Sequence, residues 1–403
     1  MKQMKRVYIV AAKRTAIGKF LGSLANVTPA NMAAMVMRDI IKTTAINPCA
    51  LDEVIAGNIL MAGQKQGIAR QAAIAAGIPV EVPAWCLNMI CGSGMKSIMT
   101  AYNSIVCDEA QMILAGGTEN MSNAGFVMPG NIRQGIKLGD FNALDHMVYD
   151  GLTDAFSGQH MGITAENIAQ MYQISRGEQD AYAWQSLTKA IEAIDSGRFK
   201  NEIVPIEMVQ KKSTILFDTD EHPARTSTPE KLALLSPAFK KEGTVTAGNS
   251  SGINDGAAFV LLASQQAIEK HHLTPLVEII ATGQAGVEPQ IMGIGSVPAI
   301  ASALQKSSLK LKDIPVMELN EAFAAQSLAV AKQLSIDHNM DYQTLTARIN
   351  PNGGAIALGH PIGSSGARIT VSLIHEMIKE NHSFGLASLC IGGGMGTAVI
   401  LKR

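Results

Sequence analysis

The chain has 403 residues, enough for two or three domains with large buried cores. Its formal net charge of −1 leaves no electrostatic footprint for nucleic acid, and no apolar run approaches the about 18 residues of a membrane span. It is 47% hydrophobic but only 4% aromatic, with 37 glycines and 21 methionines, which favours an α/β protein over an all-β one.

The first part of the chain alternates apolar strands with amphipathic helices. We expect strands at 7–12, 54–60, 84–87 and 110–117, and helices at 29–41, 67–76 and 95–106. Thr28 and Pro29 are the cap and the first-turn residue of the first helix. Continuous apolar strands that alternate with helices indicate a parallel sheet covered on both faces.

The pattern changes between about residue 123 and residue 242. Glycines, prolines and charges cluster there, and only two helical stretches stand out, near 163–173 and 178–195. We interpret this region as an inserted, partly helical module that covers a substrate. Its charges are mixed, but four cations are candidates to contact a polyanionic ligand: Arg225, Lys231, Lys240 and Lys241.

The α/β alternation resumes after residue 245. The expected strands are 256–263, 276–282, 316–319, 386–391 and 397–401, and the expected helices are 264–271, 322–334 and 367–380. In each half a glycine turn leads through a helix to an apolar strand and a run of glycines, at 91–117 and at 360–394. This repeat predicts a pseudo-twofold pair of sheets, with Cys91 and His360 facing one site from opposite halves.

Cys91 stands where a predicted strand turns into a helix. Glycines at 92 and 94 allow the backbone to pass tightly there. The thiol faces the positive end of the helix, which favours the reactive thiolate. A small buried thiol beside a glycine turn is the alternative for this residue considered alone.

Three further groups complete a chemical set. His360 lies in the glycine-dense loop 352–366 and is followed by proline, a rigid placement suited to a base beside a thiol. Cys390 ends a predicted strand before a glycine nest that can hold an oxyanion. Asn320 opens a helix, as a cap or as a catalytic group. Two thiols, an imidazole and an amide suggest acyl transfer through a thioester with proton removal from carbon, whereas a hydrolase leaves the second thiol unexplained.

The sequence resembles the thiolase family over essentially its whole length, and within it the acetyl-CoA acetyltransferase branch. The matching motifs are residues 88–94, 116–122, 160–166, 248–256, 320–323, 352–366 and 390–396. The resemblance implies duplicated βαβαβαββ halves in an αβαβα layered α/β fold with an inserted loop domain. The implied domains are 1–122 with 246–272 as the N-terminal half, 123–245 as the loop domain for CoA covering and tetramerisation, and 273–403 as the C-terminal half.

The resemblance also implies roles for the reactive residues. Cys91 is the acylated nucleophile and His360 the base that activates it. Cys390 is the acid/base that deprotonates the methyl carbon of a second acetyl-CoA. Asn320 holds a water that forms one oxyanion hole with His360, and the backbone N–H groups of Cys91 and Gly392 form the other.

The family pattern places further residues around coenzyme A and the acyl group. These are Leu152, His160, Met161, Arg225, Phe239, Ala247, Gly248, Ser251 and Phe323. His160 and the run 133–140 resemble the short-chain, acetoacetyl-CoA class. The segment 335–348 is a few residues longer than usual, and we expect a surface insertion there.

The expected reaction is the reversible condensation of two acetyl-CoA molecules to acetoacetyl-CoA and CoA, by ping-pong kinetics and without a metal or redox cofactor. A longer-chain 3-ketoacyl-CoA thiolase is the alternative within the class. A non-catalytic acyl-CoA-binding relative commonly lacks one reactive position, whereas all four are present here. A nucleotide-binding dehydrogenase is disfavoured because the glycine motif at 92–97 lacks its third glycine.

Expected partners are CoA thioesters and three further copies of the chain, as a dimer of dimers, with neither nucleic acid nor membrane. Five cysteines without CxxC spacing indicate neither a disulfide framework nor a metal knuckle. Basic residues precede the first acidic residue, Asp39, as in a transit peptide, but the strand at 7–12 begins almost at once. We therefore expect no leader and a cytoplasmic protein.

Overall fold

The computed structural model describes residues 5–210 and 213–403. Its main feature is a single sheet of eleven strands with the path β13-β14-β15-β12-β1-β11-β5-β3-β4. Along that path the strands are β13 (Val316–Leu319), β14 (Phe384–Ile391), β15 (Met395–Lys402), β12 (Val277–Gly286), β1 (Val7–Thr15), β11 (Asn254–Ser264), β5 (Met112–Asn120), β3 (Glu53–Gly57) and β4 (Ala84–Leu87). The short strands β2 (Gly18–Lys19) and β8 (Ile203–Val204) pair with β11 and β1.

The sheet consists of two like halves that meet at the antiparallel pair β1–β12. In one half β1 and β11 are antiparallel, β11 and β5 antiparallel, and β5 and β3 parallel. In the other, β12, β15, β14 and β13 repeat the same three relations in order. The predicted repeat is therefore confirmed. The expectation of a parallel sheet was wrong in part. Strand β11 is antiparallel to both of its neighbours, β1 and β5, and β15 is antiparallel to both of its neighbours, β12 and β14.

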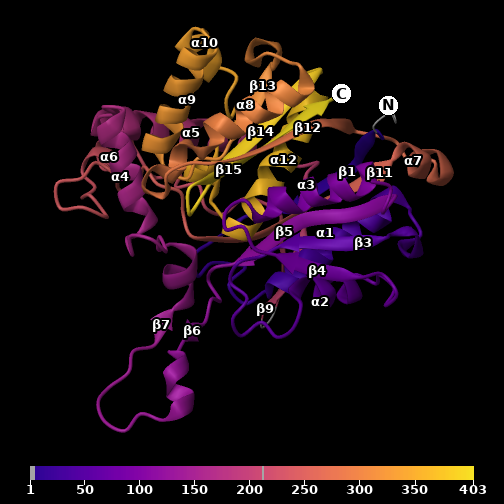
Figure 1. Ribbon diagram of the computed structural model, residues 1–403, viewed down its shortest axis with the longest axis horizontal. Coiled ribbons are helices and arrows are strands. Elements are labelled where there is room, and N and C mark those ends of the chain that lie inside the picture. Colours follow the sequence, from indigo (N-terminus) through magenta and orange to yellow (C-terminus); the bar gives the residue numbers. More distant parts are fainter. Residues whose placement is uncertain (1–4, 211–212) are drawn as a thin grey trace.

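Helices form three layers around the two halves, as Figure 1 shows. The helices α1 (Pro29–Thr44) and α2 (Ile68–Ala75) cover the outer face of the first half. Between the halves lie α3 (Ser93–Val106) and α12 (Ile362–Lys379), which pack against each other. The outer face of the second half is covered by α8 (Ser296–Ser307) and α9 (Ala324–Asp337). This is the αβαβα arrangement that the resemblance implied.

Three apolar cores lie between these layers. Successive side chains of a strand point to opposite faces of the sheet and so belong to different cores. Leu114 of β5 packs under α1 and α2, whereas its neighbour Ile113 packs against α3 and α12. In the second half, Leu386 of β14 faces α8 and α9, and Leu389 faces the central helices. The central strands β5, β11 and β14 are covered on both faces, which explains why they are buried almost throughout rather than at alternate residues.

The remaining helices and strands occupy the inserted region and the connections. They are the 3-10 helices η1 (Pro48–Ala50), η2 (Gly130–Gln134), η4 (Pro289–Gly295) and η5 (Leu311–Asp313), the π-helical turn η3 (Met147–Gly151), the helices α4 (Met161–Met171), α5 (Arg176–Asp195), α6 (Pro229–Ala233), α7 (Gln265–His271), α10 (Tyr342–Thr346) and α11 (Ala355–Leu358), and the strand pairs β6 (Phe126–Val127) with β7 (Leu144–Asp145) and β9 (Ile206–Gln210) with β10 (Ser213–Phe217).

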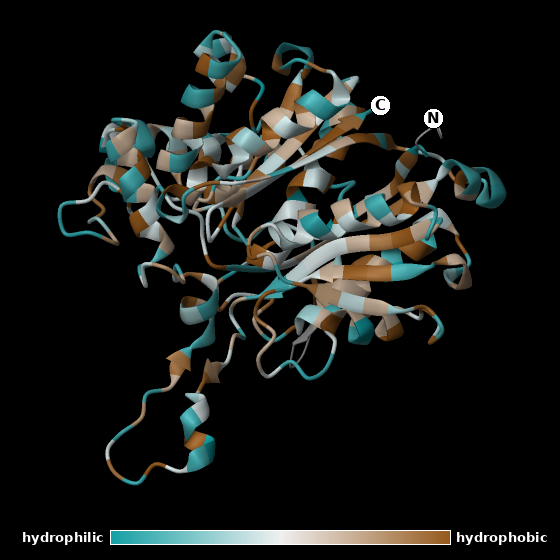
Figure 2. Ribbon diagram, in the orientation of Figure 1, coloured by the Kyte–Doolittle hydropathy of each residue, from teal (hydrophilic) through white to brown (hydrophobic). Residues whose placement is uncertain are grey.

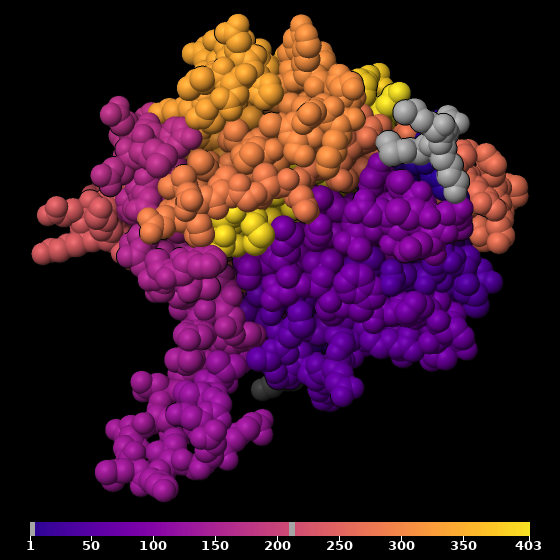
Figure 3. Space-filling model, viewed as in Figure 1, coloured from indigo at the N-terminus to yellow at the C-terminus, as the bar shows by residue number. Residues whose placement is uncertain are grey.

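Part of the inserted region forms an arm. Residues 123–145, which carry β6 and β7, extend away from the body of the molecule (Figure 3). Apolar side chains on this arm face solvent in the single chain, with Leu138 97% exposed and Phe126 68% exposed. Brown, hydrophobic ribbon marks both strands in Figure 2. The inserted region thus has two parts, the arm and a helical part built from α4, α5 and α6 against the second half.

Local sequence accounts for several element boundaries. Thr28 caps α1 by accepting a hydrogen bond from the Asn31 N–H at 3.2 Å, as predicted.

Strand β4 was predicted as buried but is the edge of the sheet, where Trp85 is 38% exposed. Helix α12 begins at Ile362, directly after Pro361, rather than at 367. The predicted surface insertion at 335–348 forms the end of α9 and α10, and its Leu345 is fully buried in the outer core. In the described ranges, 5–210 and 213–403, no helix has the length and apolar character needed to cross a membrane.

Candidate active site

A cavity of about 570 Å³ opens where the two halves meet the inserted region. Eleven of the sequence-predicted site residues line it: Cys91, Leu152, His160, Met161, Phe239, Ala247, Ser251, Phe323, His360, Cys390 and Gly392. They come from the turn before α3, the turn before α12, the end of β14, the helical part of the inserted region and the loop before β11. Residues 91 and 390, almost three hundred positions apart in sequence, thus share one cavity.

The turn that carries Cys91 is held by local hydrogen bonds. The Ser93 hydroxyl accepts from the Met89 N–H at 2.8 Å and donates to the Ile90 carbonyl at 2.7 Å. Ile90 takes a left-handed φ of 45°, a strained conformation for a β-branched residue. Gly92 leaves room for the second half, since a Cβ there would lie 2.3 Å from Ile391 Cδ1. The glycine is needed for close approach, and the strain falls on the residue before the thiol.

Backbone contacts bring the two turns together. A Cβ on Gly117 would lie 2.0 Å from the Gly363 carbonyl oxygen, and one on Gly366 would lie 2.5 Å from the Met95 nitrogen. The buried carboxylate of Glu119 also accepts hydrogen bonds from the N–H groups of Gly363 at 3.1 Å and Ile59 at 3.0 Å. These contacts dock the start of α12 onto β5 and onto the start of α3, and so fix His360 relative to Cys91.

The tautomer of His360 follows from its partners. The Ser365 hydroxyl donates its single proton to the Pro361 carbonyl at 2.9 Å, so its oxygen accepts from the His360 Nδ1–H at 2.6 Å. Nε2 therefore carries the lone pair, and it is buried without a hydrogen-bond partner among the described residues. Burial, with the positive charge of Arg368, lowers the pKa of His360 to about 3. The ring is a neutral proton acceptor.

Both thiols are neutral in this environment. Burial raises the pKa of Cys91 to about 11, although the backbone N–H groups of Gly392 and of Cys91 itself act to lower it. The expectation of a thiolate stabilised by the helix was thus wrong, because loss of water outweighs the helix end. Burial and the neighbouring Cys91 sulfur also raise the pKa of Cys390. A thiolate at either position must therefore be formed by proton transfer during a reaction.

Asn320 lies beneath the cavity at the end of β13, and its side chain is not among the lining groups. It is 1% exposed, and both its amide nitrogen and its amide oxygen lack hydrogen-bond partners within the part of the chain that the structure describes. Its backbone N–H donates to the Ser388 carbonyl at 3.0 Å, which ties it to the strand of Cys390. A buried amide without protein partners is suited to hold a water or a polar ligand group.

An aromatic wall faces the thiols. The rings of His160 and Phe239 stack with centroids 4.7 Å apart, and Phe239 meets Phe323 edge-on at 6.2 Å. His160 Nδ1 accepts from the Gly162 N–H at 3.0 Å, so its Nε2 carries the proton. Burial lowers the pKa of His160, which is consistent with a neutral ring. The wall therefore offers one N–H donor among apolar groups.

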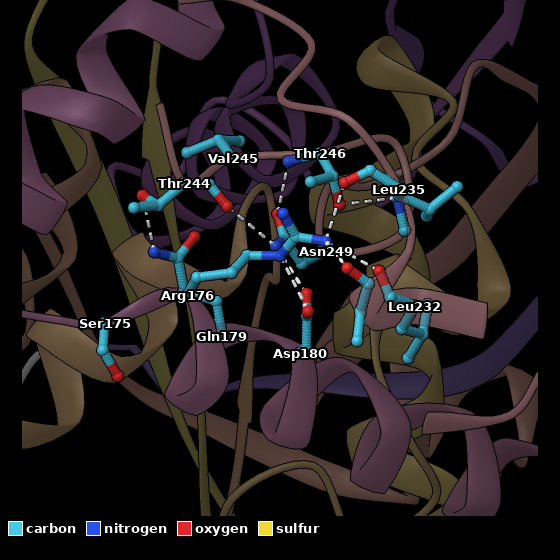
Figure 4. A network of polar contacts seen from close by, with 12 residues as sticks. Ser175, Arg176, Gln179, Asp180, Leu232, Leu235, Thr244, Val245, Thr246 and Asn249 are labelled. Atoms are coloured by element: carbon cyan, nitrogen blue, oxygen red, sulfur yellow. Dashed lines mark hydrogen bonds and ion pairs between the residues drawn. The ribbon is translucent and has the colours of Figure 1, made fainter. Parts of the chain in front are cut away.

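The loop before β11 forms another wall, and a polar network holds it on α5 (Figure 4). Asp180 of α5 accepts from Arg176 Nε at 2.7 Å and from Asn249 Nδ2 at 2.9 Å. The side-chain oxygen Oδ1 of Asn249 accepts a hydrogen bond from the Thr246 N–H at 2.8 Å. Because Ala247 and Ser251 flank Asn249, these bonds set the shape of the cavity wall without touching the cavity.

Two predicted binding residues lie elsewhere. Arg225 is on the surface, where it pairs with Asp195 at 2.7 Å outside the cavity. Gly248 lines a smaller neighbouring cavity with Leu232 and Leu235. Sequence reasoning missed Lys19, Phe20 and His222, which line the main cavity. Only the glycine turn after β1 hinted at the first two, and His222 lies in a loop whose fold no sequence pattern indicated.

Two like α/β halves with two thiols and an imidazole at their junction are suited to acyl transfer through a thioester. The family model described as "Thiolase, N-terminal domain" matches residues 7–266, and that described as "Thiolase, C-terminal domain" matches residues 273–403. The chain belongs to the thiolase family. This confirms the resemblance seen in the sequence.

Individual relatives cover almost the whole chain. An acetyl-CoA acetyltransferase of Pseudomonas aeruginosa is 52% identical over 99% of this chain and 100% of its own. The crystal structure of the Bacillus anthracis acetyl-CoA acetyltransferase has a TM-score of 0.94 at 43% identity, with 99% of each chain covered. The crystal structure of human mitochondrial 3-ketoacyl-CoA thiolase in complex with CoA has a TM-score of 0.92 at 42% identity, covering 99% of this chain and 98% of that one.

Proposed function

We propose that the protein is an acetyl-CoA C-acetyltransferase, which reversibly condenses two acetyl-CoA molecules to acetoacetyl-CoA and CoA. The observation that carries the proposal is the convergence of Cys91, His360 and Cys390 on one cavity, with a lone pair on His360 Nε2. Relatives of about half identity that are named for this activity support the choice of substrate.

In the first half-reaction Cys91 becomes acetylated. His360 Nε2 takes the thiol proton as the sulfur attacks the acetyl-CoA carbonyl, so that no resting thiolate is needed. The C–S bond to CoA then breaks, and Cys390 protonates the departing CoA thiolate. Acetyl-Cys91, a thiolate at Cys390 and a protonated His360 remain.

In the second half-reaction the Cys390 thiolate removes a methyl proton from another acetyl-CoA. The carbanion attacks the acetyl group on Cys91, and a carbon–carbon bond forms as the bond to Cys91 breaks. Protonated His360 returns its proton to the Cys91 sulfur. All three groups regain their starting protonation states, so the cycle needs neither a metal nor a redox cofactor.

Two oxyanion sites lower the barriers. The backbone N–H groups of Cys91 and Gly392 both act on the Cys91 sulfur, so a carbonyl attacked by that sulfur lies beside them. Asn320, with its unpartnered amide, holds a water that donates with His360 to the enolate oxygen of the second acetyl-CoA. Each such donor contributes on the order of 3 kcal/mol by mutational precedent.

The CoA arm enters past the loop of Ala247 and Ser251 and the aromatic wall, between Leu152, Met161 and Phe239. The structure gives no support to Arg225 as a CoA ligand. Lys19 is the more suitable cation, because it lies on the cavity and its side chain is 58% exposed.

A longer-chain 3-ketoacyl-CoA thiolase is the second candidate, because a relative with that name shares the fold at 42% identity. Comparing turnover of acetoacetyl-CoA with that of a ten-carbon 3-ketoacyl-CoA separates the two. Preference for the long substrate would replace our choice. A non-catalytic acyl-CoA binder would leave Cys91 unmodified.

We also propose a cytoplasmic homotetramer. All five cysteines are free thiols, which suits a reducing compartment. The free edge at β4 is a template for strand pairing with a second copy, and the apolar arm 123–145 provides a second contact between dimers.

The direct test of the chemistry is mass spectrometry of the protein after exposure to acetoacetyl-CoA. We expect an acetyl group on the Cys91 peptide and none on the Cys390 peptide. We expect the Cys91→Ser variant to lose acetylation. The control variant Cys49→Ser, which changes an exposed thiol outside the cavity, should retain it. An unmodified Cys91 in active protein would end the proposal.

A further inference from the structure

A buried cation lies on α12 behind His360. Arg368 is 2% exposed, and all three guanidinium nitrogens lack hydrogen-bond partners among the residues that the structure describes. A guanidinium offers five N–H donors and stays charged in proteins. Burying such a group without hydrogen bonds is costly, so its presence calls for a compensating interaction or a role.

Acidic side chains surround this cation at longer range. Arg368 Nη1 lies 3.5 Å from Glu318 Oε2, and Glu318 is two residues before Asn320 at the end of β13. Glu202 and Asp220 also attract it, although Arg14 holds both of them directly at 2.6 and 2.7 Å. The charge of Arg368 is therefore held in place but is not cancelled by a close bidentate partner.

Arg368 lies in the N-terminal half of α12, the end of the helix that follows His360. Arg368 lies three residues after Ser365, which bonds His360 Nδ1, so both side chains leave the same face of α12. Helical side chains also lean toward the N-terminus, where His360 lies. The positive charge of Arg368 adds to burial in lowering the pKa of His360.

We propose that Arg368 is a positioning residue whose fixed positive charge acts together with burial to keep the imidazole of His360 unprotonated, so that Nε2 is free to accept the Cys91 proton. This inference rests on the proposed function, in which His360 is the base. Without the charge, His360 would become protonated at a higher pH and would no longer accept that proton.

Other ionisable groups near His360 do not supply this effect. They are Cys91 before α3, Cys390 on β14, His160 before α4, His222 and Lys19 across the cavity, and Glu119 of β5, which accepts a hydrogen bond from the start of α12. The thiols and His160 are neutral. Burial raises the pKa of Glu119 to about 7, so this group is either neutral or negative and never positive. Lys19 is solvated and lies 3.8 Å from Glu221, so its charge is screened. Arg368 is the buried, permanently positive group of this set.

The test is the pH dependence of the second-order rate constant for Cys91 acetylation by acetoacetyl-CoA. At low pH this rate constant falls as His360 becomes protonated, and we call that part of the profile the acid limb. In Arg368→Met the acid limb should shift to higher pH by about one to two pH units, the size expected for a nearby elementary charge. Arg368→Lys, which keeps the charge, should restore the limb toward that of the wild type. A merely structural role for Arg368 would lower thermal stability and leave the limb in place.

Glu318→Gln is the matched control. Burial raises the pKa of Glu318 to about 8, so it carries a proton throughout the acid limb and its amide replacement changes no charge there. Its limb should coincide with that of the wild type. A limb that shifts equally in Glu318→Gln and Arg368→Met would overturn the proposal, because disturbance of packing would then explain both.

A measurement on the wild type covers the case in which Arg368→Met does not fold. Nitrogen-15 NMR of labelled histidines, with His360→Asn to assign the signal, should show the neutral Nδ1–H tautomer at pH 6. A protonated ring at that pH would refute the inference. Failure of the proposed function is distinct, since it would show as absent acetylation in the wild type.

Discussion

At the scale of single residues, the two thiols differ in what they should do when removed. Cys390→Ala should still accept an acetyl group on Cys91, more slowly because the departing CoA thiolate lacks its proton donor, but fail to condense, with a loss of at least about 100-fold in condensation, a typical acid/base contribution. Mass spectrometry and a condensation assay on the same sample measure the two steps. Cys107→Ala, at an exposed thiol, is the control. Full condensation by Cys390→Ala would remove the two-thiol assignment.

The serine behind the histidine provides a second test. Ser365→Ala removes the acceptor of the Nδ1–H, so His360 loses its fixed tautomer and acetylation should slow by about tenfold, the value of one hydrogen bond. The neighbouring Ser364 is equally buried and its hydroxyl does not contact the ring, so Ser364→Ala should keep its rate. Equal acetylation rates in the two variants would show that the hydrogen bond between His360 Nδ1 and Ser365 is not needed to fix the tautomer of His360.

Much of the reactive chemistry was predictable because each residue stands beside glycine or proline in a recognisable motif. Cys91, His360 and Cys390 do meet on one cavity, as the repeat required. The protonation states were not predictable. A thiol at a helix start looks activated in sequence, but burial depends on what the other half of the chain places above it, and here burial decides the sign.

At the scale of elements, the contact of α12 with β5 and α3 depends on glycines, which have no side chain. Gly117→Ala would place a Cβ 2.0 Å from the Gly363 carbonyl, and neither backbone can move aside, so we expect a loss of about 1–3 kcal/mol in unfolding free energy and reduced acetylation. Thermal denaturation and the acetylation rate measure both effects.

Gly177→Ala is the matched control for that change. Gly177 lies in the first turn of α5 with nothing within 4 Å of the added carbon, so the same substitution should be neutral or stabilise by about 0.5–1 kcal/mol. If both variants had the same stability, the packing account of the helix contact would be wrong.

Element boundaries were predictable where capping chemistry is local, as at Thr28. They were missed where tertiary structure decides. The apolar composition of β4 predicts a buried strand, but its place at the sheet edge leaves Trp85 partly exposed in a single chain. The start of α12 lies inside a glycine-rich stretch of low helix propensity, and docking against α3 rather than propensity makes it helical.

At the scale of the whole molecule, the arm 123–145 is the feature that a single chain leaves unsatisfied. The double variant Phe126→Asp with Leu138→Asp should convert a tetramer to dimers, because charges would replace apolar groups at the contact. Light scattering after size exclusion gives the mass. Ile336→Asp, at an apolar residue of α9 that is 72% exposed, should remain tetrameric. An unchanged mass in the double variant would place the assembly contact elsewhere.

The position of β15 has a consequence for synthesis on the ribosome. This strand, at 395–402, lies inside the second half-sheet between β14 and β12, although it is made after both of them. Until it emerges, β12 and β14 have no common neighbour, and the turn at 392–394 that joins Cys390 to β15 cannot close. A growing chain therefore carries Cys91 long before Cys390 can take its place in the sheet, so the two thiols of the cavity are brought together late in translation.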